Sequence, residues 1–264
     1  MGTTMDYGDF PLAPPYSGYS TIYDSLCQSD FSQAFVPLVE QSIRRYGVSG
    51  KRLLDLACGT GTASIRLAAL GFQVTGVDLS GEMLGIAGSK AAKAGVSVDF
   101  RRQDMSKLEL EGTFDVVICL YDSLNHLLET EKLRSTFQGV ARLLSRGGLF
   151  VFDFNTAYCL ENDWGNRVEE ERTETATLMH LYSFDPASRI GTLELICLSR
   201  HRGRVERFRE IHHERGYTRG EVVEALGATG LLVVQEMAFP DLTPPREDSS
   251  RLIYVVRPSV ECGA

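Results

Sequence analysis

Several features that would decide the class of this protein at once are missing from its sequence. No apolar stretch approaches the ~20 residues that a membrane-spanning helix needs. The six cysteines include no CxxC pair, and Cys119 lies inside an apolar run, where a thiol behaves as a small hydrophobe. Residues 1–15 have neither a cationic start nor an apolar segment. We therefore expect a soluble, cytoplasmic protein with no signal peptide, no membrane partner and no disulfide framework.

Basic residues are also in short supply. Lys and Arg together number 27 against 35 Asp and Glu, which gives a formal net charge of -8. Proteins that bind nucleic acid contact phosphates through Lys and Arg, so nucleic acid is not an expected partner. The 264 residues, with 43% apolar and 23% charged residues, are typical of a globular protein. This length fits one large domain or a domain with a small lobe.

Short apolar segments alternate with helical patterns through the first 155 residues. A helical pattern over 30–46 comes first, and further helices are expected after Gly61, after the capping residue Ser80, and over 128–144. The last of these is expected to stop at Arg146-Gly147-Gly148. The expected strands between them are 52–57, 72–78, 96–101, 114–120 and 149–153. This order predicts a doubly wound, mostly parallel sheet of the α/β class.

After Asn155 the pattern changes to extended segments. Charged and apolar residues alternate over 168–184, 190–200 and 204–213, which favours an antiparallel insert with one wet face. Thr218 is expected to cap a helix, with Glu221 completing a capping box. Two closing strands, 231–239 and 252–257, bring the expected main sheet to seven strands.

A glycine turn joins the first strand to its helix. Gly59 and Gly61 let the backbone pass close to a ligand, and Asp78, which ends the next strand, is placed to accept from both hydroxyls of a ribose. Ser64 stands where a dinucleotide fingerprint has its third glycine. The Asp55 carboxylate beside the turn suits a ligand with a positive group better than a pyrophosphate. These two residues disfavour a nicotinamide-dependent oxidoreductase.

Five motifs in order resemble those of the class I S-adenosylmethionine-dependent methyltransferases. The first has Ala57 where many members have glycine, and together the motifs cover about residues 45–155. The matching segments are 53–61, 74–80, 103–105, 114–120 and 143–149. The resemblance implies a Rossmann-like seven-stranded sheet, with S-adenosylmethionine bound at the ends of its strands. It also implies four parts of the chain, with bounds 1–48 (cover segment and helix), 49–155 (cofactor-binding core), 156–216 (β insert over the substrate) and 217–264 (closing helix and strands).

The resemblance also implies roles for single residues. The glycine turn would approach the methionine part of the cofactor, Asp78 its ribose, and Asp104 its adenine amino group. The full set of implied cofactor-binding residues is Tyr23, Asp55, Ala57, Gly59, Gly61, Asp78, Leu79, Met83, Asp104, Met105 and Leu120. Asp55 as a cap of the following turn, and Met83 and Met105 as core residues, are the structural alternatives.

The loop that follows the fourth strand faces the transferred methyl group in this family. Here it lacks the Asn/Asp-Pro-Pro-Tyr pattern associated with methylation of adenine or glutamine amides. The candidate catalytic residues are Tyr121, His126 and His212, and the other candidates for the acceptor site are Asn125, Asn155, Tyr158, His213, Arg215 and Tyr217. For His126, a local contact that stabilises the following helix is the alternative. His212 and His213 point to opposite faces of a strand, so we predict no metal site.

The insert after the fifth strand resembles that of amino-sugar N,N-dimethyltransferases and glycine N-methyltransferase, in which it covers the acceptor pocket. We therefore expect an enzyme that transfers methyl groups to a small molecule by direct in-line displacement, with nitrogen slightly preferred over oxygen. A cofactor-binding module without turnover remains the alternative, with a nicotinamide-dependent oxidoreductase less favoured. The sequence leaves the acceptor and the oligomeric state open.

Overall fold

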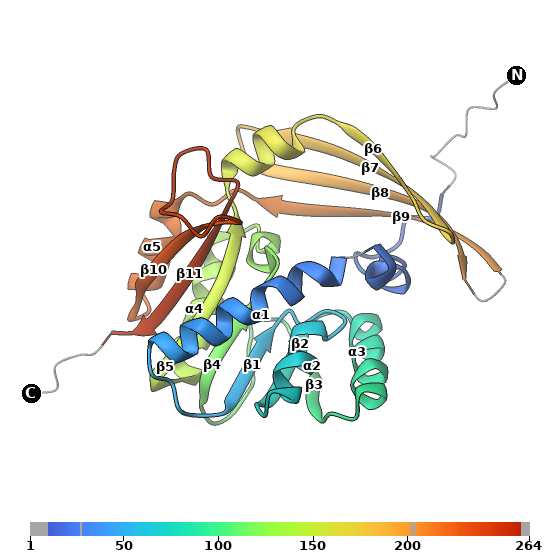
Figure 1. Ribbon diagram of the computed structural model, residues 1–264. Coiled ribbons are helices and arrows are strands. Elements are labelled where there is room, and N and C mark those ends of the chain that lie inside the picture. The colour runs from blue at the N-terminus through green and yellow to red at the C-terminus, as the bar shows by residue number, and fades with distance from the viewer. Residues whose placement is uncertain (1–9, 27, 202–203, 260–264) are drawn as a thin grey trace, which may run out of the picture.

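A mixed seven-stranded sheet forms the centre of the protein (Figure 1). The structure is a computed structural model that describes residues 10–26, 28–201 and 204–259. Strands β1 to β5 run parallel, and β11 pairs antiparallel with both β5 and β10. In spatial order the strands are β10 (Leu231–Phe239), β11 (Arg251–Pro258), β5 (Leu144–Asn155), β4 (Phe114–Cys119), β1 (Arg52–Leu56), β2 (Gln73–Asp78) and β3 (Val98–Arg102). The expected α/β fold is confirmed.

Helices cover both faces of this sheet. Helices α1 (Gln28–Arg45) and α2 (Thr62–Ala69) pack on one face, and α4 (Thr130–Leu143) and α5 (Arg219–Gly227) pack on the other. The central strand β4 is apolar at every position except Asp115 because both of its faces are covered. Val116 and Ile118 pack in the hydrophobic core under α1 and α2, whereas Val117 and Cys119 pack in the core under α4 and α5. All four side chains are fully buried.

Local residue chemistry explains where three helices begin or end. The Ser80 hydroxyl accepts from the Met83 N–H at 3.2 Å and caps α3 (Gly81–Ala94), and Thr218 and Glu221 form the expected capping box on α5. The expected helix stop at Gly147-Gly148 is wrong. Helix α4 ends at Leu143, and β5 begins at once because Leu144 is extended and buried beside Phe114. The two glycines lie in an irregular stretch of β5, where the pairing register with β4 shifts.

The insert between β5 and α5 is a separate antiparallel sheet. Four strands form it in the order β6 (Val168–Arg172), β7 (Ala176–Asp185), β8 (Ile190–His201) and β9 (Arg204–Arg215). The expectation of a single extended segment over 168–184 is wrong, because a turn divides it. The Thr173 hydroxyl accepts from the Ala176 N–H at 3.0 Å, and the Thr173 N–H donates to the Ala176 carbonyl at 2.8 Å.

The N-terminal segment lies between the insert sheet and the core (Figure 1). It contains two short 3-10 turns, η2 (Tyr19–Thr21) and η3 (Tyr23–Leu26). Tyr19, Ile22 and Leu26 are buried together with an apolar patch of the insert sheet. That patch consists of Ala176, Leu178, Leu195, Cys197 and Phe208. The insert and the N-terminal segment therefore share one hydrophobic core.

Two further observations concern expectations on cysteines and membranes. Within the described residues, Cys58, Cys119, Cys159 and Cys197 are free thiols, and Cys27 and Cys262 lie outside the described part. No helix in that described part combines the length and apolar character needed to cross a membrane.

Candidate functional site

A cavity of about 1390 Å³ opens between the carboxyl ends of the core strands and the inner face of the insert sheet. Its core end is lined by the turns after β1, β2 and β3, and its insert end by the loop after β4, the N-terminal segment and the insert strands. Pockets for single small molecules commonly measure ~300–1,000 Å³, so this cavity has room for two ligands side by side. The residues expected to bind cofactor or act in catalysis that line it are Tyr23, Ala57, Gly59, Asp78, Leu79, Met83, Asp104, Met105, Leu120, Tyr121, His126 and His212.

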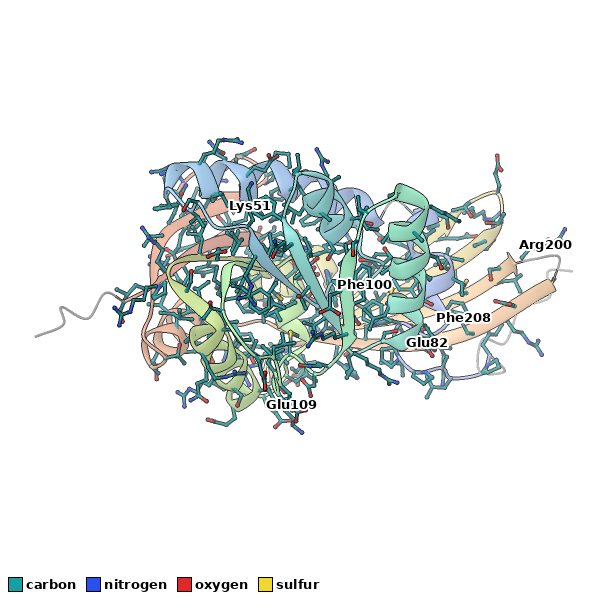
Figure 2. All side chains as sticks on the ribbon, turned by 90° about the horizontal axis from the view of Figure 1, so that it is seen from below. Lys51, Glu82, Phe100, Glu109, Arg200 and Phe208 are labelled. Atoms are coloured by element: carbon teal, nitrogen blue, oxygen red, sulfur yellow. The ribbon has the colours of Figure 1, made fainter. Side chains whose placement is uncertain are left out.

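The two glycines of the turn, Gly59 and Gly61, have different structural roles. Gly59 has a φ of +54°, and a Cβ added there would meet nothing within 4 Å, so its backbone faces open space in the cavity. Gly61 has a φ of +75°, and a Cβ there would lie 2.9 Å from both Ala87 and Phe100. Phe100 of β3 is labelled in Figure 2. Gly61 therefore serves the packing of α2 against its neighbours and does not line the cavity.

Ala57 departs from the usual glycine of the first motif at a backbone position that favours glycine. Its φ is +53°, in the left-handed region, where a Cβ costs about 1–2 kcal/mol. The turn therefore keeps a conformation that its own residue disfavours. The surrounding hydrogen bonds hold it there, including one from the Cys58 N–H to the Val77 carbonyl at 3.0 Å.

Asp55 lies beneath the turn and does not line the cavity. It is 2% exposed, and the Ser64 hydroxyl donates to its Oδ2 at 2.5 Å. Burial raises the pKa of Asp55 to about 7, with the Ser64 hydrogen bond acting against that rise and Asp78 adding to it. Ser64, which replaces the third glycine of a dinucleotide fingerprint, thus satisfies a buried carboxyl group.

Asp78 ends β2 at the wall of the cavity. Its carboxylate accepts from the backbone N–H groups of Gly59 and Ser80, each at 2.8 Å, and burial raises its pKa. These two bonds hold the carboxylate beside the glycine turn. Leu79, next in sequence, is 64% exposed and presents an apolar side chain to the same end of the cavity.

Two anchors hold the N-terminal segment over the cavity. Asp24 accepts from the Thr60 hydroxyl at 2.8 Å and from Lys90 at 2.7 Å, which ties the segment to the glycine turn. On the insert side, Glu210 of β9 is fully buried and accepts from three backbone N–H groups at 2.7–2.9 Å, those of Tyr16, Gly18 and Tyr19. The His212 Nε2 lies 3.0 Å from the same carboxylate. His212 therefore supports this anchor as well as lining the cavity.

His126 is engaged at both ring nitrogens. Its Nδ1 lies 3.0 Å from the His213 carbonyl oxygen, which can only accept, so Nδ1 carries the hydrogen. Its Nε2 then accepts from the Tyr16 hydroxyl at 2.9 Å. Burial lowers the pKa of His126 and raises that of Tyr16 well above its usual value, so both groups are neutral near pH 7. In this arrangement His126 positions Tyr16 and offers no free nitrogen.

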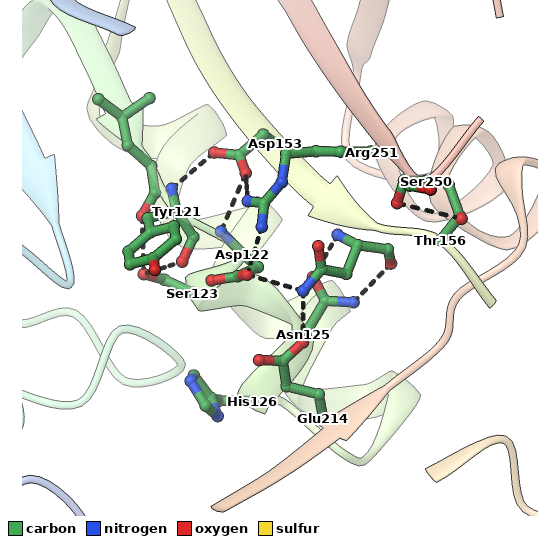
Figure 3. Close-up of polar contacts among 12 residues, drawn as sticks. Tyr121, Asp122, Ser123, Asn125, His126, Asp153, Thr156, Glu214, Ser250 and Arg251 are labelled. Atoms are coloured by element: carbon green, nitrogen blue, oxygen red, sulfur yellow. Dashed lines mark hydrogen bonds and ion pairs between the residues drawn. The ribbon is translucent and has the colours of Figure 1, made fainter. Parts of the chain in front are cut away.

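At the insert end of the cavity, three carboxyl groups lie near the Arg251 guanidinium, which contacts two of them directly (Figure 3). Arg251 of β11 contacts the Asp153 carboxylate and donates to Asp122 at 2.6 Å. Asp153 also accepts from the N–H groups of Tyr121 at 2.7 Å and Asp122 at 3.0 Å, which orients the loop after β4. Both of these loop residues have positive φ values.

Glu214 is the third carboxyl group, and it lines the cavity. The Asn155 amide nitrogen donates to Glu214 at 2.9 Å and to Asp122 at 2.7 Å. Burial raises the pKa of Glu214 well above its usual value, Asp122 raises it further, and the hydrogen bond from Asn155 opposes the rise. Asp122, Asp153 and Glu214 therefore outnumber the Arg251 guanidinium beside them.

Four of the expected acceptor-site residues do not line the cavity. Asn125 is fully buried and pairs with the backbone of Asn155, and the Arg215 guanidinium donates to the Leu128 carbonyl at 3.0 Å. The Tyr217 hydroxyl donates to the Leu127 carbonyl. These three residues brace the loop after β4 against the returning insert. Tyr158 is 38% exposed and does not line the cavity, whereas Asn155 and His213 do line it.

Sequence reasoning missed Asp122, Glu210, Glu214 and Arg251 as site residues. For the two glutamates a signal existed, because residues two apart on a strand share a face. Glu210 and Glu214 therefore flank His212 on the buried face of β9. No local pattern marked Arg251. Among the described residues, no three His, Cys, Asp or Glu side chains are grouped to hold a metal ion.

Comparisons with known proteins agree with this architecture. Residues 53–148 match the family model described as "Methyltransferase domain". A protein of Geobacillus sp. (strain WCH70) named "Putative methyltransferase" is 33% identical over 92% of this chain and 99% of its own length.

Two solved structures extend the similarity beyond the matched core. The crystal structure of an S-adenosylmethionine-dependent methyltransferase from Clostridium acetobutylicum has a TM-score of 0.83 at 26% identity, over 92% of this chain and 99% of its own. The sugar N-methyltransferase KedS8 from Streptoalloteichus has a TM-score of 0.71 at 23% identity, over 97% of this chain and 98% of its own. Both similarities extend past residues 53–148 into the insert sheet. The chain belongs to the S-adenosylmethionine-dependent methyltransferases.

Proposed function

We propose that the enzyme transfers the methyl group of S-adenosylmethionine to a basic amine nitrogen of a small molecule. The observation that carries this proposal is the charge of the cavity. Among the described residues that line it, nine are Asp or Glu and four are Lys or Arg. Such a surface attracts a cationic acceptor and repels an anionic one.

The residues at the core end of the cavity fit S-adenosylmethionine. Gly59 leaves open space where a side chain would intrude, and the anchored Asp78 carboxylate has acceptor capacity for the two ribose hydroxyls. Leu79 and Met83 would flank the adenine ring, and Asp104, whose Oδ1 is held by Ser106, would accept from its amino group. The further residues that we assign to this binding site are Tyr23, Ala57, Met105 and Leu120. When bound, the cofactor supplies a methyl group on a positively charged sulfur.

We assign indirect roles to the two expected cofactor residues that lie outside the cavity. Asp55 would support the turn through Ser64, and Gly61 would set the position of α2. Neither residue needs to touch the cofactor for its loss to weaken binding, because both determine where the Gly59 backbone lies.

The insert end would hold and orient the acceptor. The insert sheet and the N-terminal segment cover the cavity on two sides, so an acceptor must be small enough to enter between them. Alignment of the acceptor nitrogen and exclusion of water are the main contributions a protein makes to a direct displacement. We assign that task to Tyr16, which His126 holds in place, and to Tyr121, which stacks on Phe31 with ring centroids 4.6 Å apart.

The structural similarity to a sugar N-methyltransferase supports a nitrogen acceptor, although at 23% identity it rests on the fold. The acidic cavity supports nitrogen as the acceptor atom independently of the fold. An oxygen acceptor is the alternative, and it would give no reason for the carboxylate excess. A small amine, with no phosphate group near the reacting nitrogen, is the acceptor that the charges favour.

Two measurements test the proposal. The first is calorimetric titration with S-adenosylhomocysteine, in which Asp78→Asn should weaken binding about 10- to 100-fold, because charged hydrogen bonds to the ribose are lost. Asp99→Asn, on the neighbouring strand and half-exposed, is the matched control and should bind as the natural protein does. The second is a methylation assay, read by mass spectrometry, over amines paired with alcohols of the same carbon skeleton. Transfer to the alcohols and not to the amines would overturn the proposed nitrogen acceptor.

A further inference from the structure

We propose that Glu214 is the residue that receives the proton of the acceptor's ammonium group, and that it holds a proton of its own until that group arrives. This inference rests on the proposed methylation of an amine. It concerns a step that any such enzyme must solve, because a protonated amine has no lone pair with which to attack a methyl group.

The position of Glu214 is the first observation. Its side chain extends from β9 into the cavity at the insert end, beside the loop that carries Tyr121 and Asp122 (Figure 3). It is 5% exposed overall, and the donor to its carboxyl group is the Asn155 amide at 2.9 Å. A carboxyl group has about four acceptor positions, and the Asn155 amide occupies one of them.

The division of donors among the three carboxyl groups is the second observation. Arg251 contacts Asp153 and Asp122 directly, and Asp153 also accepts two backbone N–H groups. Glu214 has the neutral Asn155 amide in place of a charge. When buried like charges outnumber their counter-ion, the group with the weakest donors keeps its proton. That group is Glu214.

Burial and the neighbouring carboxyl groups favour the protonated form of Glu214, and the Arg251 guanidinium and the Asn155 hydrogen bond oppose it. The loop after β4, strand β5 and the N-terminal segment all present groups that are anionic or neutral near it, and β11 presents the one guanidinium. The titratable and charged groups around it are Asp122, Tyr121, Asp153, Cys159, Tyr16 and Arg251. Glu214 is therefore protonated at rest and ionises when a new positive charge enters beside it.

The proton transfers balance over one cycle. An arriving ammonium group displaces the stored proton from Glu214 to solvent and pairs with the carboxylate. One N–H bond then breaks and an O–H bond forms on Glu214, which leaves an electron pair on nitrogen. That pair forms the N–C bond while the C–S bond breaks with its electrons going to sulfur. The product leaves as a methylated ammonium ion, and Glu214 is protonated again.

The resting proton is tested without any acceptor. We expect infrared spectra of the S-adenosylhomocysteine complex at pH 7 to contain the carbonyl stretch of a protonated carboxyl group that Glu214→Gln lacks. Glu206→Gln removes an exposed carboxylate from the same strand and should leave that band unchanged. Identical spectra for the natural protein and Glu214→Gln would overturn the inference, and so would a band that Glu206→Gln also removes.

The displacement of the proton is tested with n-butylammonium as a cationic probe and n-butanol as its neutral match. Calorimetry of the S-adenosylhomocysteine complex in two buffers of different ionisation enthalpy counts the protons released. We expect close to one proton per butylammonium bound, little release from Glu214→Gln, and none with butanol. Binding without release, release that persists in Glu214→Gln, or no binding of either probe contradicts the role of Glu214. Binding of butanol alone contradicts the proposed amine acceptor instead, so the two failures are distinguishable.

Discussion

The core end and the insert end of the cavity are built in different ways. At the core end, most of the residues that face the cavity come within a few positions of the carboxyl end of a parallel strand, as Gly59 and Asp78 do. At the insert end, Arg251 meets Asp122 across 129 residues of sequence, and Glu214 comes from a different sheet. Backbone geometry dominates the first end, and buried charge dominates the second. Substitutions at the two ends of the cavity should therefore change stability and binding in different ways.

The largest effect is expected from removing the Arg251 guanidinium at the insert end. Arg251→Met leaves Asp122 and Asp153 buried without their counter-ion, which should cost about 3–5 kcal/mol of unfolding free energy near pH 8. Burial already raises the pKa values of Asp153 and Glu214, so lowering the pH to 5 should move both groups toward their neutral forms and shrink the loss. Urea denaturation at the two pH values measures both effects.

Arg257→Met is the matched control for that prediction. Arg257 lies on the same strand, and its guanidinium donates to the Gly147 carbonyl at 3.4 Å. We expect a loss below about 1 kcal/mol with no dependence on pH, as for most surface substitutions. A loss in Arg251→Met that is equally large at pH 5 and pH 8 would show that packing, and not charge, makes this residue necessary.

The core end has one large electrostatic effect of its own, at Asp55. Its pKa rises on folding from 3.8 to about 7, so its contribution to stability is present below pH 3.8 and is lost as the pH rises through 7. At 1.36 kcal/mol per pKa unit the loss amounts to about 4 kcal/mol. The variant Asp55→Asn should not show this loss of stability. The natural protein should therefore lose stability relative to this variant between pH 4 and pH 8, as measured by denaturation in the absence of cofactor.

Asp99→Asn serves as the control for the pH dependence, because Asp99 is half-exposed on β3. Its stability curve should run parallel to that of the natural protein. A constant difference between Asp55→Asn and the natural protein over this pH range would mean that Asp55 keeps an ordinary pKa.

A pair of glycine substitutions separates packing from ligand contact at the core end. Gly61→Ala should cost about 2–4 kcal/mol of stability, because its methyl group meets Ala87 and Phe100 at 2.9 Å and its φ is positive. Gly59→Ala faces open space and should cost about 1–2 kcal/mol, but weaken S-adenosylhomocysteine binding at least tenfold. Thermal unfolding and calorimetry measure the two properties. If both variants lost binding affinity in the same proportion to their loss of stability, the distinction between packing at Gly61 and ligand contact at Gly59 would be contradicted.

The smallest effect is expected from relieving the strain at Ala57. Ala57→Gly should raise the unfolding free energy by about 1 kcal/mol or less, since the left-handed penalty disappears while the unfolded chain gains freedom. The midpoint of thermal unfolding should rise by about 2 °C. Ala69→Gly, at the end of α2 and with an exposed side chain, should lower it instead. A lower midpoint for both variants would mean that Ala57 makes contacts worth more than its strain.

The core sheet, its order along the chain and most of its residues at the ligand space were predictable because their signals are local. Strand β4 is apolar at every position except Asp115 because both of its faces are covered, and the capping box of Thr218 and Glu221 can be read from four residues. The failures were also local in origin. Gly147-Gly148 is a strong helix stop, but burial of Leu144 ends α4 earlier. The turn at Thr173 was hidden by the strand-like residues on either side of it.

Local sequence patterns were enough to predict the α/β class, the glycine turn with Asp78, and the methyltransferase family that these motifs imply. Short-range order carries that information, because a parallel strand and the turn after it are adjacent in sequence. It did not suffice for the partners of charged groups. Only the packing of the insert on the core brings Glu214, Asp122 and Arg251 together, with Asn155 between the carboxyl groups. Burial then sets their protonation, and burial is a property of the assembled fold.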